Sequence, residues 1–117
     1  MNTSKDLDRE LDWIDERFLK SMARVHYLCM IERGHSNGYE IIHQIQQQYN
    51  IKLSTAAVYP TLQRLEEDGY IRGEWVDKTY PQKKRYLLTP SGKSLLNAAR
   101  TRITALADTL IKGSDTK

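Results

Sequence analysis

The sequence has little of what places a protein outside the cytoplasm. Its single cysteine, Cys29, cannot form an internal disulfide, which excludes the cross-linked framework of many small secreted proteins. No apolar run approaches the roughly 20 residues that a membrane-spanning helix needs. The first residues also lack the apolar core of a secretory signal. From these absences we expect a cytoplasmic protein without a membrane segment.

Apolar residues and net charge are both modest. Hydrophobic residues make up 39% of the 117 residues, and the mean hydropathy is −0.65. A chain of this length suits one domain, and so small a core suggests that a second subunit completes the burial of apolar surface. The formal net charge is only +3, so composition alone does not indicate a nucleic-acid partner. We therefore expect a dimer whose other partners depend on where the charges lie.

Charge is unevenly distributed along the chain. Residues 1–17 hold three basic and six acidic residues, a net charge of −3. Residues 70–89 hold five basic and two acidic residues, and residues 90–117 hold the same numbers, so each of these segments carries +3. This distribution is expected if one face of the molecule meets a polyanion. Because the two ends have opposite charge, we expect the first and last helices to meet, either within one chain or between two.

The stretch that begins at Ser54 has the pattern of a short amphipathic helix. Val58, Leu62 and Leu65 recur at helical spacing and are expected in the core. Ser54 has the side chain of an N-cap, whose hydroxyl accepts from an otherwise unpaired backbone N–H. Gly69 lies where such a helix would end.

The outward face of this helix carries hydrogen-bonding groups, and the helix contains one proline. Its polar members are Thr55, Tyr59, Gln63 and Arg64. Pro60 removes one hydrogen bond within the helix, so we expect a distorted first turn. Arg64 has two possible roles, because it can read guanine in a DNA groove or pair with Asp68 four residues later.

Two short strands follow the helix. Residues 70–76 and 85–88 have strand patterns, and the polar segment 77–84 between them carries lysine. A helix followed at once by a hairpin with a basic tip is typical of a winged helix-turn-helix domain that binds DNA. Because side chains alternate along a strand, Lys83 and Arg85 share one face and Lys84 lies on the other.

Two helical segments precede the central helix. An apolar stripe over residues 7–33 predicts one long helix or two helices end to end, with a weak point near Glu16 to Leu19 and a stop at Gly34. Asn37 and Glu40 stand three residues apart, as in a capping box, and predict the start of the next helix.

The final helix begins at Thr89 and Pro90 and is expected to run to about Lys112. Its apolar positions are spaced three and four residues apart, which is a heptad seam suited to packing against a partner chain. The expected dimer interface uses both terminal helices. Its residues are Leu7, Leu11, Trp13, Ile14, Leu96, Ala99, Ile103, Leu106 and Leu110.

These patterns together predict a mainly α fold with a small β-hairpin. An acidic helical arm occupies residues 1–17, a winged helix-turn-helix domain of three helices and a two-stranded wing occupies residues 18–89, and a dimerisation helix occupies residues 90–117.

Three motifs carry a resemblance to a known family. They are His35–Ile42, Val58–Ile71 and Lys83–Gly92, within a matching region of about residues 18–97. In this order and spacing they resemble the PadR-like transcriptional regulators. The resemblance implies a homodimeric winged helix-turn-helix protein, usually a repressor, that binds a pseudo-palindromic operator. It also implies that the terminal helices make the dimer, and that the proline after Tyr59 is a family feature.

We expect double-stranded DNA to be bound by the central helix, the start of the preceding helix and the wing. The candidate residues are Tyr39, Ser54, Thr55, Tyr59, Gln63, Arg64, Lys78, Tyr80, Lys83, Lys84 and Arg85. The first half of the central helix would meet phosphates or base edges in the major groove, and the wing would meet the backbone or the minor groove. Tyr39 either donates to a phosphate or is half-buried in the core. Trp75 is expected to pack within the hairpin.

The sequence does not indicate catalysis or a metal. His26 and Cys29 lie in the apolar stripe without a third group to orient them, and a buried free cysteine behaves as a small apolar residue. Adding His35 and His43 does not give the paired ligand spacing of a metal site. We therefore expect no enzyme activity and no cofactor.

Two other functions stay open beside a DNA-binding repressor. The first is a protein-interaction adaptor, which would use the glutamine-rich helix and the acidic arm. The second is a sensor-repressor that binds a small aromatic effector at the dimer interface. The final helix lacks the aromatic residues that form the drug-binding pore of some PadR-like proteins, and the sequence does not identify an effector.

Overall fold

The computed structural model describes residues 3–76 and 83–113, which form helices and one hairpin. In chain order the elements are α1 (Ser4–Ser21), α2 (Ala23–Glu32), α3 (Gly38–Tyr49), α4 (Thr55–Glu67), β1 (Ile71–Val76), β2 (Lys83–Leu88) and α5 (Pro90–Lys112). The strands pair antiparallel, with Gly73 opposite Tyr86 and Trp75 opposite Lys84. The predicted fold class is confirmed: the molecule is mainly helical, with the helix and hairpin order of a winged helix-turn-helix.

The core lies between α2, α3, α4 and the base of the hairpin. Val58, Leu62 and Leu65 of α4 are fully buried, as their helical spacing predicts. The other buried apolar residues are Leu19, Tyr27, Leu28, Met30, Ile31, Ile41, Ile45, Ile71, Tyr86 and Leu96. In the part of the chain that the structure describes, no charged side chain is buried, so apolar packing dominates the stability of this core.

The helix caps follow the sequence closely. The Ser54 hydroxyl accepts from the Ala57 amide at 3.2 Å, and the Thr89 hydroxyl accepts from the Gly92 amide at 3.0 Å. Asn37 caps α3 by accepting from the Glu40 amide at 3.0 Å. In a capping box the Glu40 side chain would accept from the Asn37 backbone N–H. Here the Glu40 carboxylate instead accepts from the Asn37 side-chain amide and from the Ser36 backbone N–H.

The break between α1 and α2 lies at Met22, not near Glu16 to Leu19 as predicted. Leu19 is buried in the core, so the last turn of α1 still belongs to the packed region and the chain can change direction only after it. At the break, the Met22 amide donates to the Phe18 carbonyl at 3.0 Å, and the His26 ring donates to the Met22 carbonyl at 2.7 Å. The first bond closes the last turn of α1, and the second lies in the first turn of α2.

Helix α4 runs through Pro60 without a break. The Ser54 carbonyl accepts from both the Ala57 and the Val58 amides, at 3.1 and 3.2 Å. The predicted distortion of the first turn is therefore limited to this shared hydrogen bond, which is common at helix ends. The exposed face of α4 stays regular.

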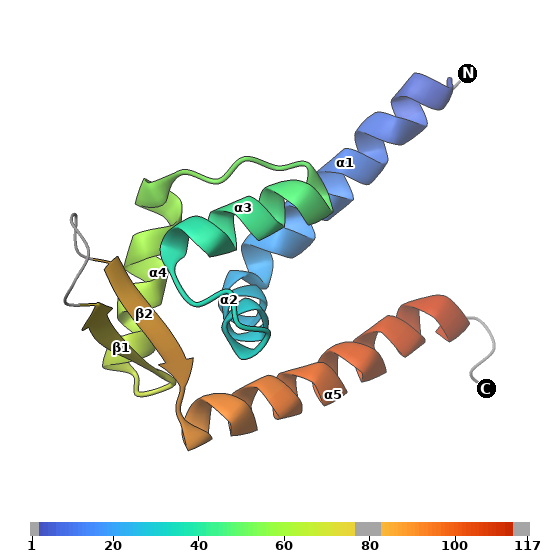
Figure 1. Cartoon of the computed structure of the whole chain (residues 1–117). Coiled ribbons are helices and arrows are strands. Elements are labelled where there is room, and N and C mark those ends of the chain that lie inside the picture. Colours follow the sequence, from blue (N-terminus) through green and yellow to red (C-terminus); the bar gives the residue numbers. More distant parts are fainter. Residues whose placement is uncertain (1–2, 77–82, 114–117) are drawn as a thin grey trace.

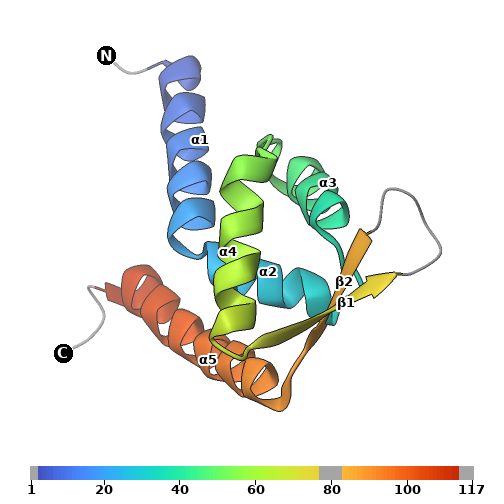
Figure 2. The ribbon, with the colours of Figure 1, turned by 90° about the vertical axis from the view of Figure 1, so that its left-hand side faces the viewer.

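The elements are arranged so that α4 and the hairpin form one side of the molecule. Figure 2 looks onto this side, with α4 in front and both strands beside it. The free ends of α1 and α5 both extend away from this side, toward the right of Figure 1, and lie apart from each other. Although both terminal helices are long, no helix within residues 3–76 and 83–113 is apolar enough to cross a bilayer.

Candidate nucleic-acid interface

The exposed face of α4 contains the polar residues that the sequence singled out. Ser54, Thr55, Gln63 and Arg64 are exposed, and Tyr59 is 37% exposed. Ala56 and Pro60 are exposed between them, and the sequence analysis did not place them on this surface. The helical period could have done so, because residues four apart lie on one face and these two lie opposite the buried stripe. The surface of α4 is thus a mixture of polar and small apolar groups.

Polar groups toward the end of α4 pair with carboxylates in its last turn and at its C-cap. The Gln63 amide donates to Glu67 at 3.4 Å, and Arg64 forms an ion pair with Asp68 at 3.4 Å. The pairing alternative for Arg64 is therefore present in the structure. Its side chain is still 70% exposed, and a guanidinium has five N–H donors, so most of them face solvent.

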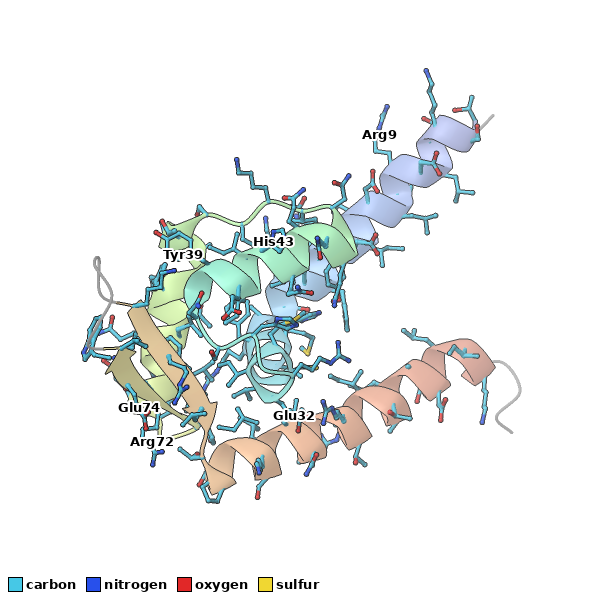
Figure 3. All side chains as sticks on the ribbon, viewed as in Figure 1. Arg9, Glu32, Tyr39, His43, Arg72 and Glu74 are labelled. Carbon is cyan, nitrogen blue, oxygen red and sulfur yellow. The ribbon has the colours of Figure 1, made fainter. Side chains whose placement is uncertain are left out.

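A groove of about 290 Å³ lies where the start of α3, α4 and the hairpin meet. Its lining residues are Asn37, Gly38, Tyr39, Tyr59, Trp75, Lys83, Lys84 and Tyr86. Tyr39 is 64% exposed, which rules out the half-buried alternative, and Figure 3 shows it at the start of α3 beside the hairpin. Trp75 is 59% exposed. Four aromatic rings and two lysines therefore gather in one surface groove.

The ring of Tyr59 is held against the backbone of α3. A Cβ atom added at Gly38 would lie 2.6 Å from both Cζ and the hydroxyl oxygen of Tyr59, so only glycine allows this contact. Burial raises the pKa of the Tyr59 phenol above its ordinary value, and nearby Tyr39 adds to the shift. The hydroxyl is therefore protonated at neutral pH and can donate a hydrogen bond.

The hairpin divides its cations between two faces. The strand register places Lys83 and Arg85 on one face and Lys84 on the other, as predicted from side-chain alternation. Lys83 and Arg85 are exposed, and Arg85 lies 3.6 Å from Glu74 across the hairpin. Arg72 and Glu74, both labelled in Figure 3, pair at 3.3 Å on the same strand. Lys78 and Tyr80, predicted at the tip, lie outside the described residues.

Lys84 is directed back toward α4. Its ammonium group donates to Glu66 at 2.6 Å, and only 27% of its side chain is exposed. The sequence could not show this pairing, because the two residues are 18 positions apart and belong to different elements.

A second basic group lies on the other side of α4, at the junction of α1 and α2. Lys20, Arg24 and Arg64 line a hollow of about 370 Å³ with Pro60 and Thr61. Arg24 donates to Asp68 at 2.9 Å, and Lys20 pairs with Glu16 at 2.9 Å. The sequence alone does not reveal this group, because only the fold brings its members together.

The terminal helices expose most of the apolar residues predicted at a dimer interface. Leu7, Leu11 and Ile14 are about half exposed, and Phe18 continues the same stripe along α1. Trp13 is also exposed but lies off this stripe, with the Arg17 guanidinium 5.5 Å from its ring.

On α5 the exposed fraction increases toward the free end. Ala99 and Ile103 are partly exposed, whereas Leu106 and Leu110 are 59% and 86% exposed. Leu96 is a correction to the sequence analysis: it is fully buried in the core of its own chain and has no surface to offer a partner.

Neither a metal site nor a reactive pair is present in the described parts of the chain. No group of three or more His, Cys, Asp or Glu side chains there could hold a metal ion. His26 accepts a hydrogen bond from the Tyr49 hydroxyl at 2.5 Å, and the Cys29 sulfur lies 3.6 Å from the Arg100 guanidinium. His26 therefore has a structural partner on α3 and is not paired with the thiol.

A sequence model of the transcriptional regulator PadR-like family matches residues 27–98, which include α3, α4 and both strands. The chain belongs to the PadR-like family. The resemblance found in the motifs is thereby confirmed. Members of this family are DNA-binding transcription factors and not enzymes, so this PadR-like chain is a DNA-binding transcriptional regulator. Among curated proteins, none matches the chain significantly.

Solved structures share the fold over most of the chain. The PadR family transcriptional regulator from Eggerthella lenta DSM 2243 is 21% identical, with a TM-score of 0.78 over 95% of this chain and 97% of that one. The PadR-like regulator from Bacillus cereus strain ATCC 14579 is 20% identical, with a TM-score of 0.73 over 86% of this chain and 99% of that one. At these identities the comparison shows a common fold.

Proposed function

We propose that this PadR-like regulator is a cytoplasmic repressor that binds a pseudo-palindromic operator as a homodimer. The observation that carries the proposal is the division of the molecule into two sides. The exposed face of α4 and the wing lie on one side, and the apolar ends of α1 and α5 project from the other (Figures 1 and 2). A dimer joined through those ends leaves both α4 faces free to meet DNA.

In this proposal the first half of α4 enters the major groove. Ser54, Thr55 and Tyr59 meet phosphates or base edges, and Gln63 and Arg64 lie farther along the groove. A glutamine amide can pair with adenine at two points, and an arginine guanidinium can pair with guanine in the same way. Because Gln63 pairs with Glu67 and Arg64 pairs with Asp68, base reading competes with these two contacts.

Phosphate contacts flank the inserted helix. Tyr39 is exposed at the start of α3 and can donate its hydroxyl to a phosphate. Lys83 and Arg85 are exposed cations of β2, and Lys78 and Tyr80, outside the described residues, are proposed to make contacts of the same kind. The Lys84 ammonium differs from these cations, because Glu66 holds it away from the outer face of the wing.

The dimer is proposed to form between the acidic arm of one chain and the basic last helix of the other. The free ends of α1 and α5 project from the same side of the body but lie apart within one chain, so a second copy can supply the oppositely charged helix that each one lacks (Figure 1). The proposed contacts are Leu7, Leu11, Trp13 and Ile14 of α1 and Ala99, Ile103, Leu106 and Leu110 of α5. Residues 1–17 and 90–117 then form the dimerisation segments around a DNA-binding domain at 18–89.

Selection of bound fragments from random double-stranded DNA tests this function. The purified chain should enrich a sequence with two inverted half-sites whose centres are about 10 base pairs, or a multiple of this, apart. Sedimentation of the complex should give two chains per duplex. A monomer in solution, or the recovery of fragments without symmetry, would contradict the homodimeric repressor.

A ligand-responsive repressor is a second candidate, favoured by a hollow of about 230 Å³ between α1, α2, α3 and α5. Phe18, His26, Tyr49 and Arg100 are among its lining residues. An effector bound there would raise the unfolding temperature by mass action. A thermal-shift screen of planar aromatic compounds tests this candidate, and the absence of any stabilisation would count against it.

A further inference from the structure

One carboxylate joins α4 to both strands of the wing. Oε2 of Glu66 accepts from the Gly73 amide of β1 at 3.0 Å, and Oε1 accepts from the Lys84 ammonium of β2 at 2.6 Å. Both side chains are partly buried, with 29% of Glu66 and 27% of Lys84 exposed. Partial burial strengthens such a bond relative to the exposed ion pairs of this molecule.

The ammonium of Lys84 also lies near two aromatic rings. Its nitrogen lies 5.5 Å from the centre of the Trp75 ring and 5.7 Å from the centre of the Tyr86 ring. Trp75 is the partner of Lys84 across the hairpin, so the three side chains share one face of the wing. A cation over the face of an aromatic ring is stabilised by a cation–π interaction. This interaction adds to the ion pair with Glu66 in holding the Lys84 ammonium in place.

Gly73 provides the space for this arrangement. A Cβ atom at this position would overlap Cε of Lys84 and would lie 3.0 Å from Oε2 of Glu66. Glycine in a strand interior is otherwise unfavourable and often marks a close approach of another group. The bond from Lys84 also holds the pKa of Glu66 below its ordinary value and raises the pKa of Lys84. Both groups are therefore charged at neutral pH.

We propose that Glu66 and Lys84 are positioning residues, which fix the wing at the angle where α4 and the exposed cations Lys83 and Arg85 meet one duplex. This inference rests on the proposed function. Lys84 then contributes to DNA affinity through the orientation of the wing and does not neutralise a phosphate. Glu66 contributes to binding a polyanion although it is itself negative.

The sign of the Glu66→Gln effect separates this role from simple electrostatics. If Glu66 were only a negative charge near DNA, its removal would free Lys84 and increase affinity. If it positions the wing, its removal decreases affinity, by about tenfold when a bond to a charged group is removed. Glu67→Gln is the matched control, because it removes the same charge from the next, exposed position of α4; Glu67 accepts a hydrogen bond from Gln63 and none from the wing, so among the described contacts its loss frees Gln63 for DNA and should leave affinity equal or higher.

The slope of affinity against salt gives a second readout on the selected operator. Lys83→Ala should lower this slope by about 0.9 for each phosphate that the variant no longer neutralises. Lys84→Ala should lower affinity by the same factor at every salt concentration and leave the slope unchanged, because the wing must be ordered on binding but Lys83 and Arg85 still reach the same phosphates in the complex. A reduced slope for Lys84→Ala, or increased affinity for Glu66→Gln, overturns the positioning role.

Hydrogen exchange of the free protein tests the same inference without DNA. Glu66→Gln should speed exchange of the Gly73 amide and of the paired amides of β1 and β2 at least tenfold, while the amides of α2 and α3 keep their protection. Unchanged exchange in the strands overturns the inference whether or not the chain binds DNA. Failure to bind any duplex, with faster exchange in the strands of the variant, would instead count against the proposed function alone.

Discussion

Single side chains in this fold join elements that are distant in the sequence. Glu66 binds both strands, Arg24 of α2 binds Asp68 after α4, and Arg100 of α5 binds Glu32 at the end of α2 at 2.8 Å. The sequence predicted the caps at Asn37, Ser54 and Thr89 and the buried stripe of α4 correctly, because each depends on residues close together in the chain. It did not predict these pairs, because each needs the tertiary structure to bring the partners together.

Replacement of Leu62 by alanine should strongly destabilise the fold. Leu62 is fully buried, and truncation of a buried leucine costs about 2–5 kcal/mol of unfolding free energy. Urea denaturation followed by circular dichroism measures this decrease. Gln47→Ala on the exposed face of α3 is the control and should change stability by less than about 0.5 kcal/mol. Equal effects of the two substitutions would show that the core is placed wrongly.

The Glu66 carboxylate should make stability depend on pH in the acid range. Its pKa is lowered in the folded protein, chiefly by the hydrogen bond from Lys84. A carboxyl of this kind stabilises the fold above its unfolded pKa, and the contribution disappears as pH falls through the folded pKa. The difference in unfolding free energy between the unaltered protein and Glu66→Gln should therefore shrink as the pH falls below 4.5, the ordinary pKa of a glutamate side chain. A difference that stays constant through this range would contradict the assignment.

At the scale of elements, the start of α5 depends on close contact with the end of α4. The Thr89 hydroxyl donates to the Gly69 carbonyl at 2.6 Å, and the Thr89 amide donates to the Tyr70 carbonyl at 3.2 Å. Gly92 of α5 packs directly on the Tyr70 backbone. The sequence predicted the Thr89 cap but not the contact at Gly92, since nothing in the local pattern shows which surface a helix start will meet.

Gly92→Ala should lower stability by about 1–3 kcal/mol. The added Cβ would overlap the Tyr70 carbonyl oxygen, and backbone atoms on both sides must move to relieve it. The midpoint of thermal unfolding measures the effect. Gly113→Ala provides the comparison, because a Cβ there would meet nothing within 4 Å. If Gly92→Ala were as stable as Gly113→Ala, the junction between α5 and the body would have to be arranged differently.

The whole molecule combines a packed domain with two projecting helices. The radius of gyration is 17.0 Å and the longest dimension is 57 Å, which is extended for this length because α1 and α5 leave the body (Figure 1). The heptad spacing of α5 indicated an interface, but it included Leu96, which the monomer uses for its own core. Periodicity alone cannot distinguish apolar residues that pack within a chain from those that pack between chains.

Substitution of Ile14 by glutamate should weaken the proposed dimer without unfolding the monomer. Ile14 is 52% exposed in the single chain, so the charge meets water there and would be buried only between chains. Sedimentation equilibrium should show the dimer dissociation constant increased at least about tenfold. Leu87→Glu, at a 37% exposed position of the wing, should leave the dissociation constant unchanged. Equal dissociation constants for the Ile14 variant and the unaltered protein would exclude this face of α1 from the interface.

The central claim is that two chains present α4 and the wing cations to one duplex. Titration of the selected duplex with the chain at several salt concentrations tests it most directly, since it gives both the stoichiometry and the number of phosphate contacts. We predict two chains per duplex and an affinity that falls by on the order of a thousandfold between about 50 and 200 mM salt. One chain per duplex, or an affinity that does not change with salt, would contradict the account.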